Sequence, residues 1–263
     1  MVLLDGVGLV SRARARLAAV RRGAETLPSP NIWHWPEVYE VENRAQDVHD
    51  DIWRVLGAVA DWAGRDVLDI GCGTGFHLPR FAATARHVTG VEPHEPLVRL
   101  AKDRVTLLPS VEVLTGSAQR LPLPDASVDV AHARTAYFFG PGCEQGLAET
   151  ERVLRPGGVL VIVDLDARCG PYGDWMRADL PDYDPVEVDR FFERMGFVSR
   201  TVETRWRFAD RPSLESVLRI EFSSRVADRA ARDVPGLEFP VGYRVLTRKK
   251  PAGLIVASPP PRT

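Results

Sequence analysis

The chain has 263 residues, of which 27% are charged and 44% hydrophobic, with a formal net charge of −2. This is enough for one sizeable α/β domain, and the charge balance gives no argument for nucleic-acid binding. No apolar stretch approaches the length of a membrane span. The three cysteines, Cys72, Cys143 and Cys169, fit no zinc spacing and favour a reduced thiol state in the cytoplasm, so no metal site is expected.

The two ends of the chain differ in composition from the rest. Residues 10–22 (VSRARARLAAVRR) are rich in arginine and alanine and contain no acid. A solvated amphipathic helix or a frayed terminus is favoured there over a transit-peptide-like helix or a phosphate-seeking arm. We assign residues 1–47 as an N-terminal arm and lid, 48–250 as one domain, and 251–263 as a tail expected to be disordered.

Strands and helices alternate from residue 66 onward, a pattern typical of a parallel sheet covered on both faces. We expect strands at 66–70, 87–91, 110–114, 127–132 and 158–164, and helices at 48–62, 75–86, 95–106, 143–155, 185–195 and 212–220. The Pro-Gly-Gly turn at 156–158 should end the helix before it. Late strands are expected at 196–208 and 240–249. Between them, residues 209–239 form an insertion with Ser213 as a candidate helix cap.

Residues 67–76 read VLDIGCGTGF, an apolar run followed by a glycine-rich loop. The glycines stand at alternate positions, Gly71, Gly73 and Gly75. Glycine tolerates positive φ and has no Cβ, so this backbone can approach a ligand closely. A strand, turn and helix start of this kind holds a nucleotide over a sheet edge. A dinucleotide fingerprint needs Gly or Ala where Phe76 stands, so NAD is disfavoured, and no P-loop Gly-Lys-Ser/Thr follows.

The segment DIGCGTG resembles motif I of the class I S-adenosylmethionine (SAM)-dependent methyltransferases. The likeness extends in order through HVTGVEP, VEVLTGSAQ and ETERVLRPGG. It is closest in kind to the small-molecule methyltransferases of type 11, which include ubiquinone- and menaquinone-biosynthesis enzymes. Glu92 ends the second strand about 20 residues beyond Gly71, where an acid can accept both ribose hydroxyls of an adenosine.

The resemblance implies SAM as cofactor and S-adenosylhomocysteine (SAH) as product. It places Ser117, Ala118 and Gln119 at the adenine edge, and Ala133 and Arg134 near the methionine part. Arg134 could instead neutralise a carboxylate or phosphate of the acceptor. The full set of cofactor-binding candidates is Tyr39, Asp69, Gly71, Cys72, Gly73, Gly75, Glu92, Pro93, Ser117, Ala118, Gln119, Ala133 and Arg134.

In this family the acceptor pocket is built from the N-terminal segment and the later insertions. Here these are residues 31–43, 135–143, 166–183 and 206–225, which are rich in aromatic side chains. Methyl transfer gains much from proximity and orientation, and a base is needed only if the acceptor must lose a proton. The catalytic candidates are His132, His34 and Glu37, with Tyr39 or Tyr137 as orienting groups. For His132, a packing role at the strand end is the alternative.

The implied fold is Rossmann-like, a seven-stranded sheet in the order 3-2-1-4-5-7-6. Helices cover both faces, with an N-terminal helical lid and an insertion before the last strand. The implied function is methyl transfer from SAM to an O, N or C atom of a small-molecule acceptor. The alternatives are a methyltransferase acting on RNA or a peptide, and a SAM-binding partner protein without turnover. RNA is disfavoured because HARTAYFF lacks an amino-methylation motif. The acceptor and the oligomeric state, including a homodimer, stay open.

Overall fold

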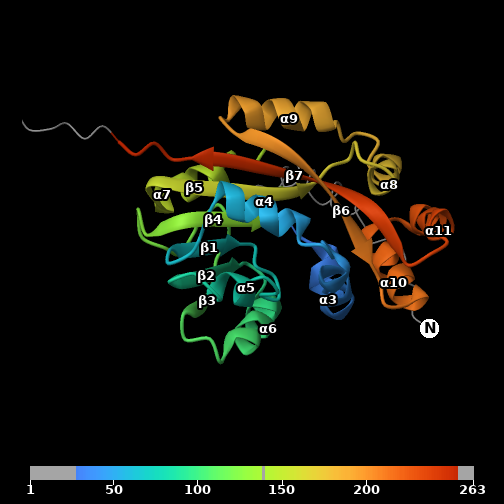
Figure 1. Cartoon of the computed structure of the whole chain (residues 1–263), viewed down its shortest axis with the longest axis horizontal. Helices are drawn as coiled ribbons and strands as arrows, with labels where there is room; N and C mark the ends of the chain where they lie inside the picture. Colours follow the sequence, from blue (N-terminus) through green and yellow to red (C-terminus); the bar gives the residue numbers. More distant parts are fainter. Residues whose placement is uncertain (1–27, 138–139, 254–263) are drawn as a thin grey trace, which may run out of the picture.

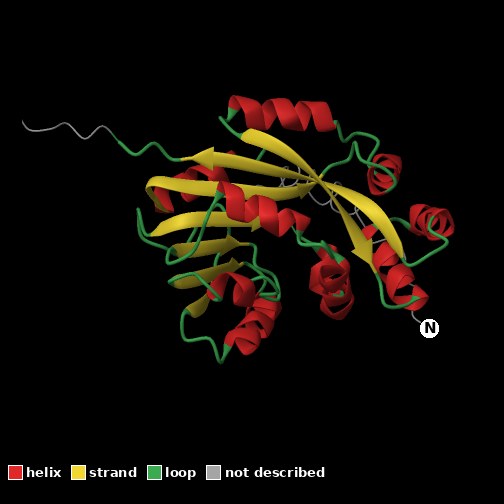
Figure 2. Ribbon diagram, viewed as in Figure 1, coloured by secondary structure: helices red, strands yellow, loops and turns green. Residues whose placement is uncertain are grey.

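The centre of the molecule is a seven-stranded sheet in the order β3-β2-β1-β4-β5-β7-β6 (Figures 1 and 2). The structure is a computed structural model and describes residues 28–137 and 140–253. Strands β1 to β5 pair in parallel, and β7 runs antiparallel to both β5 and β6. The expected strand order is therefore confirmed. The strands are β1 (Asp66–Ile70), β2 (His87–Glu92), β3 (Val111–Thr115), β4 (Val128–Arg134), β5 (Leu154–Leu165), β6 (Val198–Arg207) and β7 (Glu238–Lys249).

Helices pack on both faces of the sheet because its strands carry apolar residues on both sides. Within β5, Val161 and Val163 face one core cluster, while Leu160 and Ile162 face the other. The first face is covered by α4 (Asp51–Val59), α5 (Leu78–Ala82) and α6 (Glu95–Val105), and the second by α7 (Glu144–Val153) and α9 (Pro185–Arg194). Within the described residues, no helix is long and apolar enough to span a bilayer.

A further group of helices gathers where β6 and β7 extend beyond the rest of the sheet (Figure 1). It comprises α2 (Pro30–His34), α3 (Pro36–Ala45), α8 (Tyr172–Asp179), α10 (Arg211–Glu221) and α11 (Ser224–Asp233). Helix α10 packs against both α3 and α11, and α8 packs against β7 and α11. The segment between the last two strands thus meets the N-terminal segment, far away in the sequence, beside the carboxyl ends of the parallel strands.

Two local expectations were wrong. Helix α7 ends at Val153 and β5 starts at Leu154, so the Pro-Gly-Gly segment lies within the strand. The pairing of β4 with β5 shifts register between Val128 and Val130, and Gly157 has a φ of 82°. The additional residues of β5 at this point form an irregularity of the sheet. Asp210, not Ser213, caps α10, because its carboxylate accepts the Ser213 N–H at 2.7 Å. The arginine-rich segment 10–22 and the tail SPPPRT lie outside the described residues.

Candidate functional site

The glycine loop follows β1 directly and is held against the end of β2. The amides of Gly71 and Cys72 both donate to the Val91 carbonyl, at 2.8 and 3.1 Å. Gly71 and Gly73 have φ of 72° and 57°, the left-handed region that favours glycine. A Cβ at Gly73 would stand 2.8 Å from Cδ1 of Ile32, so a side chain there would require the Ile32 side chain to shift. The backbone of the loop is therefore presented bare at the sheet edge.

Glu92 ends β2 beside this loop and is only 4% exposed. Its Oε2 accepts the Gly73 N–H at 3.1 Å and its Oε1 accepts the His94 N–H at 3.0 Å. Burial raises the pKa of this carboxyl, while the hydrogen bonds from His94 and Gly73 oppose the rise. An ionised carboxylate offers about four acceptor positions, so two remain for a ligand. This donor and acceptor set suits the two adjacent hydroxyls of a ribose.

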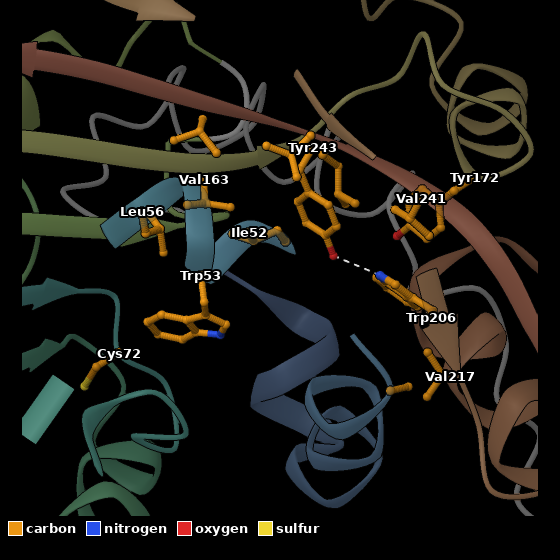
Figure 3. Close-up of a cluster of buried hydrophobic side chains, with 14 of the residues drawn as sticks. Ile52, Trp53, Leu56, Cys72, Val163, Tyr172, Trp206, Val217, Val241 and Tyr243 are labelled. Atoms are coloured by element: carbon orange, nitrogen blue, oxygen red, sulfur yellow. Dashed lines mark hydrogen bonds between the residues drawn. The ribbon is translucent and has the colours of Figure 1, made fainter. Parts of the chain in front are cut away.

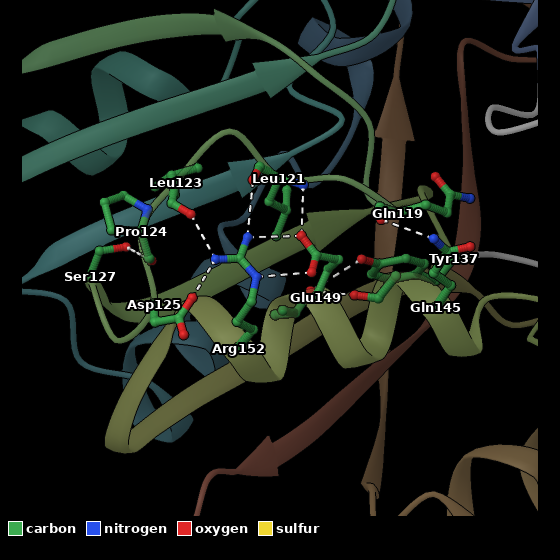
Figure 4. A network of polar contacts seen from close by, with 12 residues as sticks. Gln119, Leu121, Leu123, Pro124, Asp125, Ser127, Tyr137, Gln145, Glu149 and Arg152 are labelled. Atoms are coloured by element: carbon green, nitrogen blue, oxygen red, sulfur yellow. Dashed lines mark hydrogen bonds and ion pairs between the residues drawn. The ribbon is translucent and has the colours of Figure 1, made fainter.

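The loop after β3 forms the next part of the site, and α7 holds it in place (Figure 4). Arg152 donates to the carbonyls of Leu121 and Leu123 at 3.1 and 2.8 Å. Glu149, paired with Arg152, accepts the Leu121 N–H at 3.1 Å. Closer to the cavity, the Gln145 amide donates to the Gln119 carbonyl at 3.3 Å. The loop is thus fixed through its backbone, and its small residues are left to line the cavity.

The roof of the site comes from the N-terminal helices α2 and α3. Trp33 of α2 stacks on His94, with ring centroids 4.4 Å apart and planes 8° from parallel. Glu40 of α3 hydrogen-bonds the Thr74 hydroxyl in the glycine loop and pairs with Arg104 of α6 at 2.6 Å. These contacts tie α2 to His94 at the start of α6, and α3 to the glycine loop and α6.

Between the roof and the sheet edge lies a cavity of about 200 Å³. It is smaller than the ~300–1,000 Å³ typical of small-molecule sites. Its walls carry few groups that titrate near neutral pH: among the described residues lining it, none is a histidine or an aspartate. The lining residues are Pro28, Ser29, Ile32, Trp33, Tyr39, Asn43, Gln46, Ile70, Gly71, Cys72, Gly73, Thr74, Glu92, Pro93, Gly116, Ala118, Gln119, Arg134, Thr135, Ala136, Tyr137, Gly140, Pro141, Gly142 and Cys143.

The structure brings most of the predicted cofactor-binding residues to this cavity. Those that line it are Tyr39, Gly71, Cys72, Gly73, Glu92, Pro93, Ala118, Gln119 and Arg134. Asp69, Gly75, Ser117 and Ala133 do not. Gly75 supports the loop indirectly, because a Cβ there would lie 3.1 Å from Ala101 of α6. Asp69 lies behind the loop, where it contacts His132.

The catalytic candidates are placed differently from the sequence-based expectation. His132 is 2% exposed, does not line the cavity, and has its Nδ1 2.7 Å from Asp69 Oδ1. Its ring lies among Trp53, Phe81 and His77, on the face covered by α4 and α5. The packing alternative is the one that this geometry supports, since side chains of α4 and α5 cover the ring.

The other candidates also lack the features of a base. His34 and Glu37 are exposed and lie outside the cavity lining. Tyr137 lines the cavity, but its hydroxyl lies 3.3 Å from the Thr150 hydroxyl of α7. Burial raises the pKa of Tyr137 well above its usual range, so it remains a neutral phenol at physiological pH.

Several aromatic residues of the expected acceptor segments belong to the core. Tyr172, Trp175, Trp206 and Phe208 are buried together, and Trp206 Nε1 donates to the Tyr243 hydroxyl at 2.9 Å (Figure 3). Phe138 and Phe139 lie outside the described residues. Asn43, Thr135 and Ala136 also line the cavity, and they lie in segments that the sequence assigns to the acceptor pocket, whereas the lining residues Gln46 and Gly116 were not singled out. Gln46 follows α3 directly, and no motif in the sequence marks it.

The fold and this site define a nucleoside-binding domain of the class I methyltransferase type. Residues 68–162 match the family described as a methyltransferase domain. The chain therefore contains a class I SAM-dependent methyltransferase domain, as the glycine loop and Glu92 indicated. The matched segment runs from β1 to the middle of β5. It contains the glycine loop, Glu92 and Arg134, but neither the roof helices nor α8 to α11.

Curated relatives share the same part of the chain. A protein described as a probable S-adenosylmethionine-dependent methyltransferase from Mycolicibacterium smegmatis is 41% identical over 100 residues, covering 38% of each chain. An uncharacterized 37.1 kDa protein from a transposon of Streptomyces fradiae is 36% identical over 143 residues, covering 53% of this chain and 39% of the relative. The chain thus spans about two-fifths of the length of these relatives.

Solved structures share the fold at low sequence identity. The YcgJ protein from Bacillus subtilis superimposes with a TM-score of 0.57 at 18% identity, over 78% of this chain and all (100%) of that chain. The [4+2]-cyclase SpnF superimposes with a TM-score of 0.56 at 21% identity, over 84% and 95%. Because SpnF is a cyclase by name, this fold by itself does not specify the reaction.

Proposed function

We propose that this chain binds SAM in the cavity and transfers its methyl group to an O, N or C atom of a small-molecule acceptor. The observation that carries the proposal is the buried Glu92 carboxylate beside the bare backbone of the glycine loop. When bound, SAM supplies a methyl group on a positively charged sulfur, which is already electrophilic. The relative from Mycolicibacterium smegmatis supports the choice of this cofactor.

In this proposal the chain acts chiefly by binding and orientation. Glu92 holds the ribose hydroxyls, and the glycine backbone lies against the remainder of the cofactor. The roof residues Ile32 and Trp33 exclude water from the reacting centre. Since no histidine or aspartate is found among the described residues lining the cavity, proximity and orientation provide the acceleration. This favours an acceptor atom that is already nucleophilic when it enters.

The size of the cavity supports a small acceptor over a folded macromolecule. At about 200 Å³ under a roof of two helices, the cavity formed by the described residues is small for a polymer. A relative from Serratia marcescens, 31% identical over 128 residues, is described as a malonyl-[acyl-carrier protein] O-methyltransferase. A small acyl group delivered on a carrier is therefore one acceptor to include in a screen.

Calorimetric titration with SAH, with NADH in parallel, tests the cofactor. We expect SAH to bind and NADH not to. Glu92→Ala should weaken SAH binding by about tenfold or more, because hydrogen bonds to a charged group are lost. The matched control is Glu187→Ala, an exposed acid on α9. Equal SAH affinity in the Glu92 and Glu187 variants would contradict the ribose assignment.

Methyl transfer needs its own measurement, because cofactor binding alone does not demonstrate turnover. Purified protein is incubated with SAM labelled in the methyl group and a panel of small carboxylic acids, phenols, amines, acyl carriers and tRNA. We expect label to appear in a small molecule and SAH to accumulate. Transfer to tRNA only would favour the RNA alternative. Tight SAH binding without transfer to any acceptor would favour a non-catalytic SAM-binding protein.

A further inference from the structure

Arg134, the last residue of β4, reaches into the cavity with an unusual set of partners. Its Nη2 donates to the side-chain oxygen of Gln46 at 2.7 Å. Its guanidinium carbon lies 5.3 Å from the ring centroid of Tyr243. Neither partner carries a full negative charge: Gln46 is an amide, and burial raises the pKa of Tyr243 well above its usual range. The positive charge of Arg134 is therefore not neutralised by these contacts.

This sets Arg134 apart from the other arginines that are not classed as exposed. Within residues 28–137 and 140–253, each of the others has a carboxylate oxygen within 3.3 Å, whereas Arg134 forms no ion pair. A partly buried cation without an anion costs some free energy. The paired arginines are Arg152, Arg155, Arg205, Arg211, Arg244 and Arg248.

Gln46 fixes the direction in which this cation points. Its side-chain nitrogen donates to Glu42 Oε1 at 2.9 Å, so its oxygen is turned toward Arg134. Glu42 is itself 3% exposed and lies one turn earlier in α3. A guanidinium carries five N–H donors in a planar fork, and only one of its nitrogens is engaged by Gln46. The remaining donors suit the two oxygens of a carboxylate.

We propose that Arg134, oriented by Gln46, binds a carboxylate of a ligand in the cavity. This inference rests on the proposed function. The carboxylate has two available sources, the amino-acid part of SAM and the acceptor. Glu92 and Arg134 end strands that are separated only by β1, so they lie about 10 Å apart across the sheet edge. A ligand held by its hydroxyls at Glu92 can therefore present a carboxylate to Arg134.

The test compares ligands with and without the carboxylate. SAH and 5′-methylthioadenosine, which lacks the amino-acid part, are titrated calorimetrically into the wild type, Arg134→Gln and Arg134→Lys. If SAM provides the carboxylate, Arg134→Gln should weaken SAH by about tenfold or more and leave methylthioadenosine unchanged. Arg134→Lys should recover part of the SAH affinity, because charge remains while the planar fork is lost.

A second arm addresses the acceptor as the source. Benzoate and its neutral analogue benzamide are added to the SAH-bound proteins, and thermal stability is followed. If the acceptor provides the carboxylate, SAH affinity is unchanged in Arg134→Gln, and benzoate alone stabilises the wild-type complex but not the variant complex. The matched control is Arg194→Gln, because Arg194 is exposed, has no ion pair among the described residues and lies outside the cavity lining.

The outcomes separate this inference from the proposed function. Unchanged SAH affinity in Arg134→Gln together with no benzoate effect overturns the carboxylate site while leaving cofactor binding intact. Loss of methylthioadenosine binding along with SAH would show that the variant disturbs the whole cavity, which also overturns a carboxylate-specific role. A wild type that binds neither nucleoside refutes the proposed function, and the carboxylate site falls with it.

Discussion

The side-chain amide of Asn31 donates a hydrogen bond of 2.5 Å to the carboxylate of Glu221, 190 positions later in the chain. Both residues are buried, at 1% and 2% exposure. The hydroxyl of Tyr172 donates to the other carboxylate oxygen at 2.7 Å. This contact fastens α2, the roof of the cavity, to α10 and α8, which belong to much later parts of the sequence.

The first prediction concerns this attachment. Asn31→Ala removes one donor from the buried Glu221, so stability should fall by about 1–3 kcal/mol. The roof should also open more often, and SAH should dissociate faster. Urea unfolding and stopped-flow release of SAH, followed by tryptophan fluorescence, measure the two effects. Arg219→Ala, an exposed position on α10, is the control. An unchanged release rate in the Asn31 variant would show that α2 does not gate the cavity.

The second prediction separates backbone strain from occlusion of the glycine loop. Gly73 and Gly64 have similar φ values of 57° and 67°, but a Cβ would meet Ile32 at Gly73 and open space at Gly64. Alanine at either position should cost about 1–2 kcal/mol of stability, because both require a left-handed backbone. Only Gly73→Ala should also weaken SAH binding. Calorimetry on the two folded variants tests this, and equal SAH affinity would remove the loop from the binding site.

The third prediction assigns His132 to folding. His132→Leu leaves the buried Asp69 carboxylate without its ring partner, and we expect stability to fall by about 3 kcal/mol or more. SAH affinity of the folded fraction should stay within about twofold. His87→Leu is the matched control, because His87 lies 3.3 Å from Glu112 at the surface and should contribute less than about 1 kcal/mol. A stable His132 variant that binds SAH but loses turnover would restore the catalytic role.

The fourth prediction concerns Asp164 on β5, which is 0% exposed and whose two carboxylate oxygens have no hydrogen-bond partner among the described residues. Burial raises the pKa of its carboxyl from 3.8 to about 7, against the opposing charge of Arg244. Between these values the folded state keeps a proton that the unfolded chain has lost. Stability therefore falls as pH rises from about 4 to 7, and the loss persists above pH 7.

Asp164→Asn should remove this slope. Its unfolding free energy should match the wild type near pH 4 and exceed it by roughly 2–4 kcal/mol at pH 8. The control is Asp166→Asn. Burial raises the pKa of Asp166, but the hydrogen bonds and positive charge of Arg168 together outweigh this effect, so the net shift of the pKa is downward. The stability due to Asp166 is therefore present near neutral pH and lost as pH falls toward its lowered pKa. Parallel pH profiles for the wild type and the Asp164 variant would refute this prediction.

The meeting of the glycine loop and Glu92 at one edge of the sheet could be predicted from local sequence. The glycine loop and Glu92 sit at strand ends that periodicity marks, and parallel pairing brings such ends to one edge. The strand order followed from resemblance to the family. A helical lid was expected in residues 1–47, which contain the roof helices α2 and α3, but its contacts were not. Their positions depend on contacts with α10 and the glycine loop, which local patterns do not contain.

What surrounds the side chains at the end of β4 was decided only by the tertiary structure. His132 and Arg134 are two residues apart and therefore share a face of the sheet. His132 is covered by Trp53 of α4, whereas Arg134, just beyond that cover, reaches the cavity and Gln46. The sequence by itself determined the glycine loop, Glu92 at the end of its strand, and the alternation of side chains between the two faces of each strand. Packing between segments far apart in the chain decided which of these side chains contact a helix and which line the cavity, because local sequence does not contain those contacts.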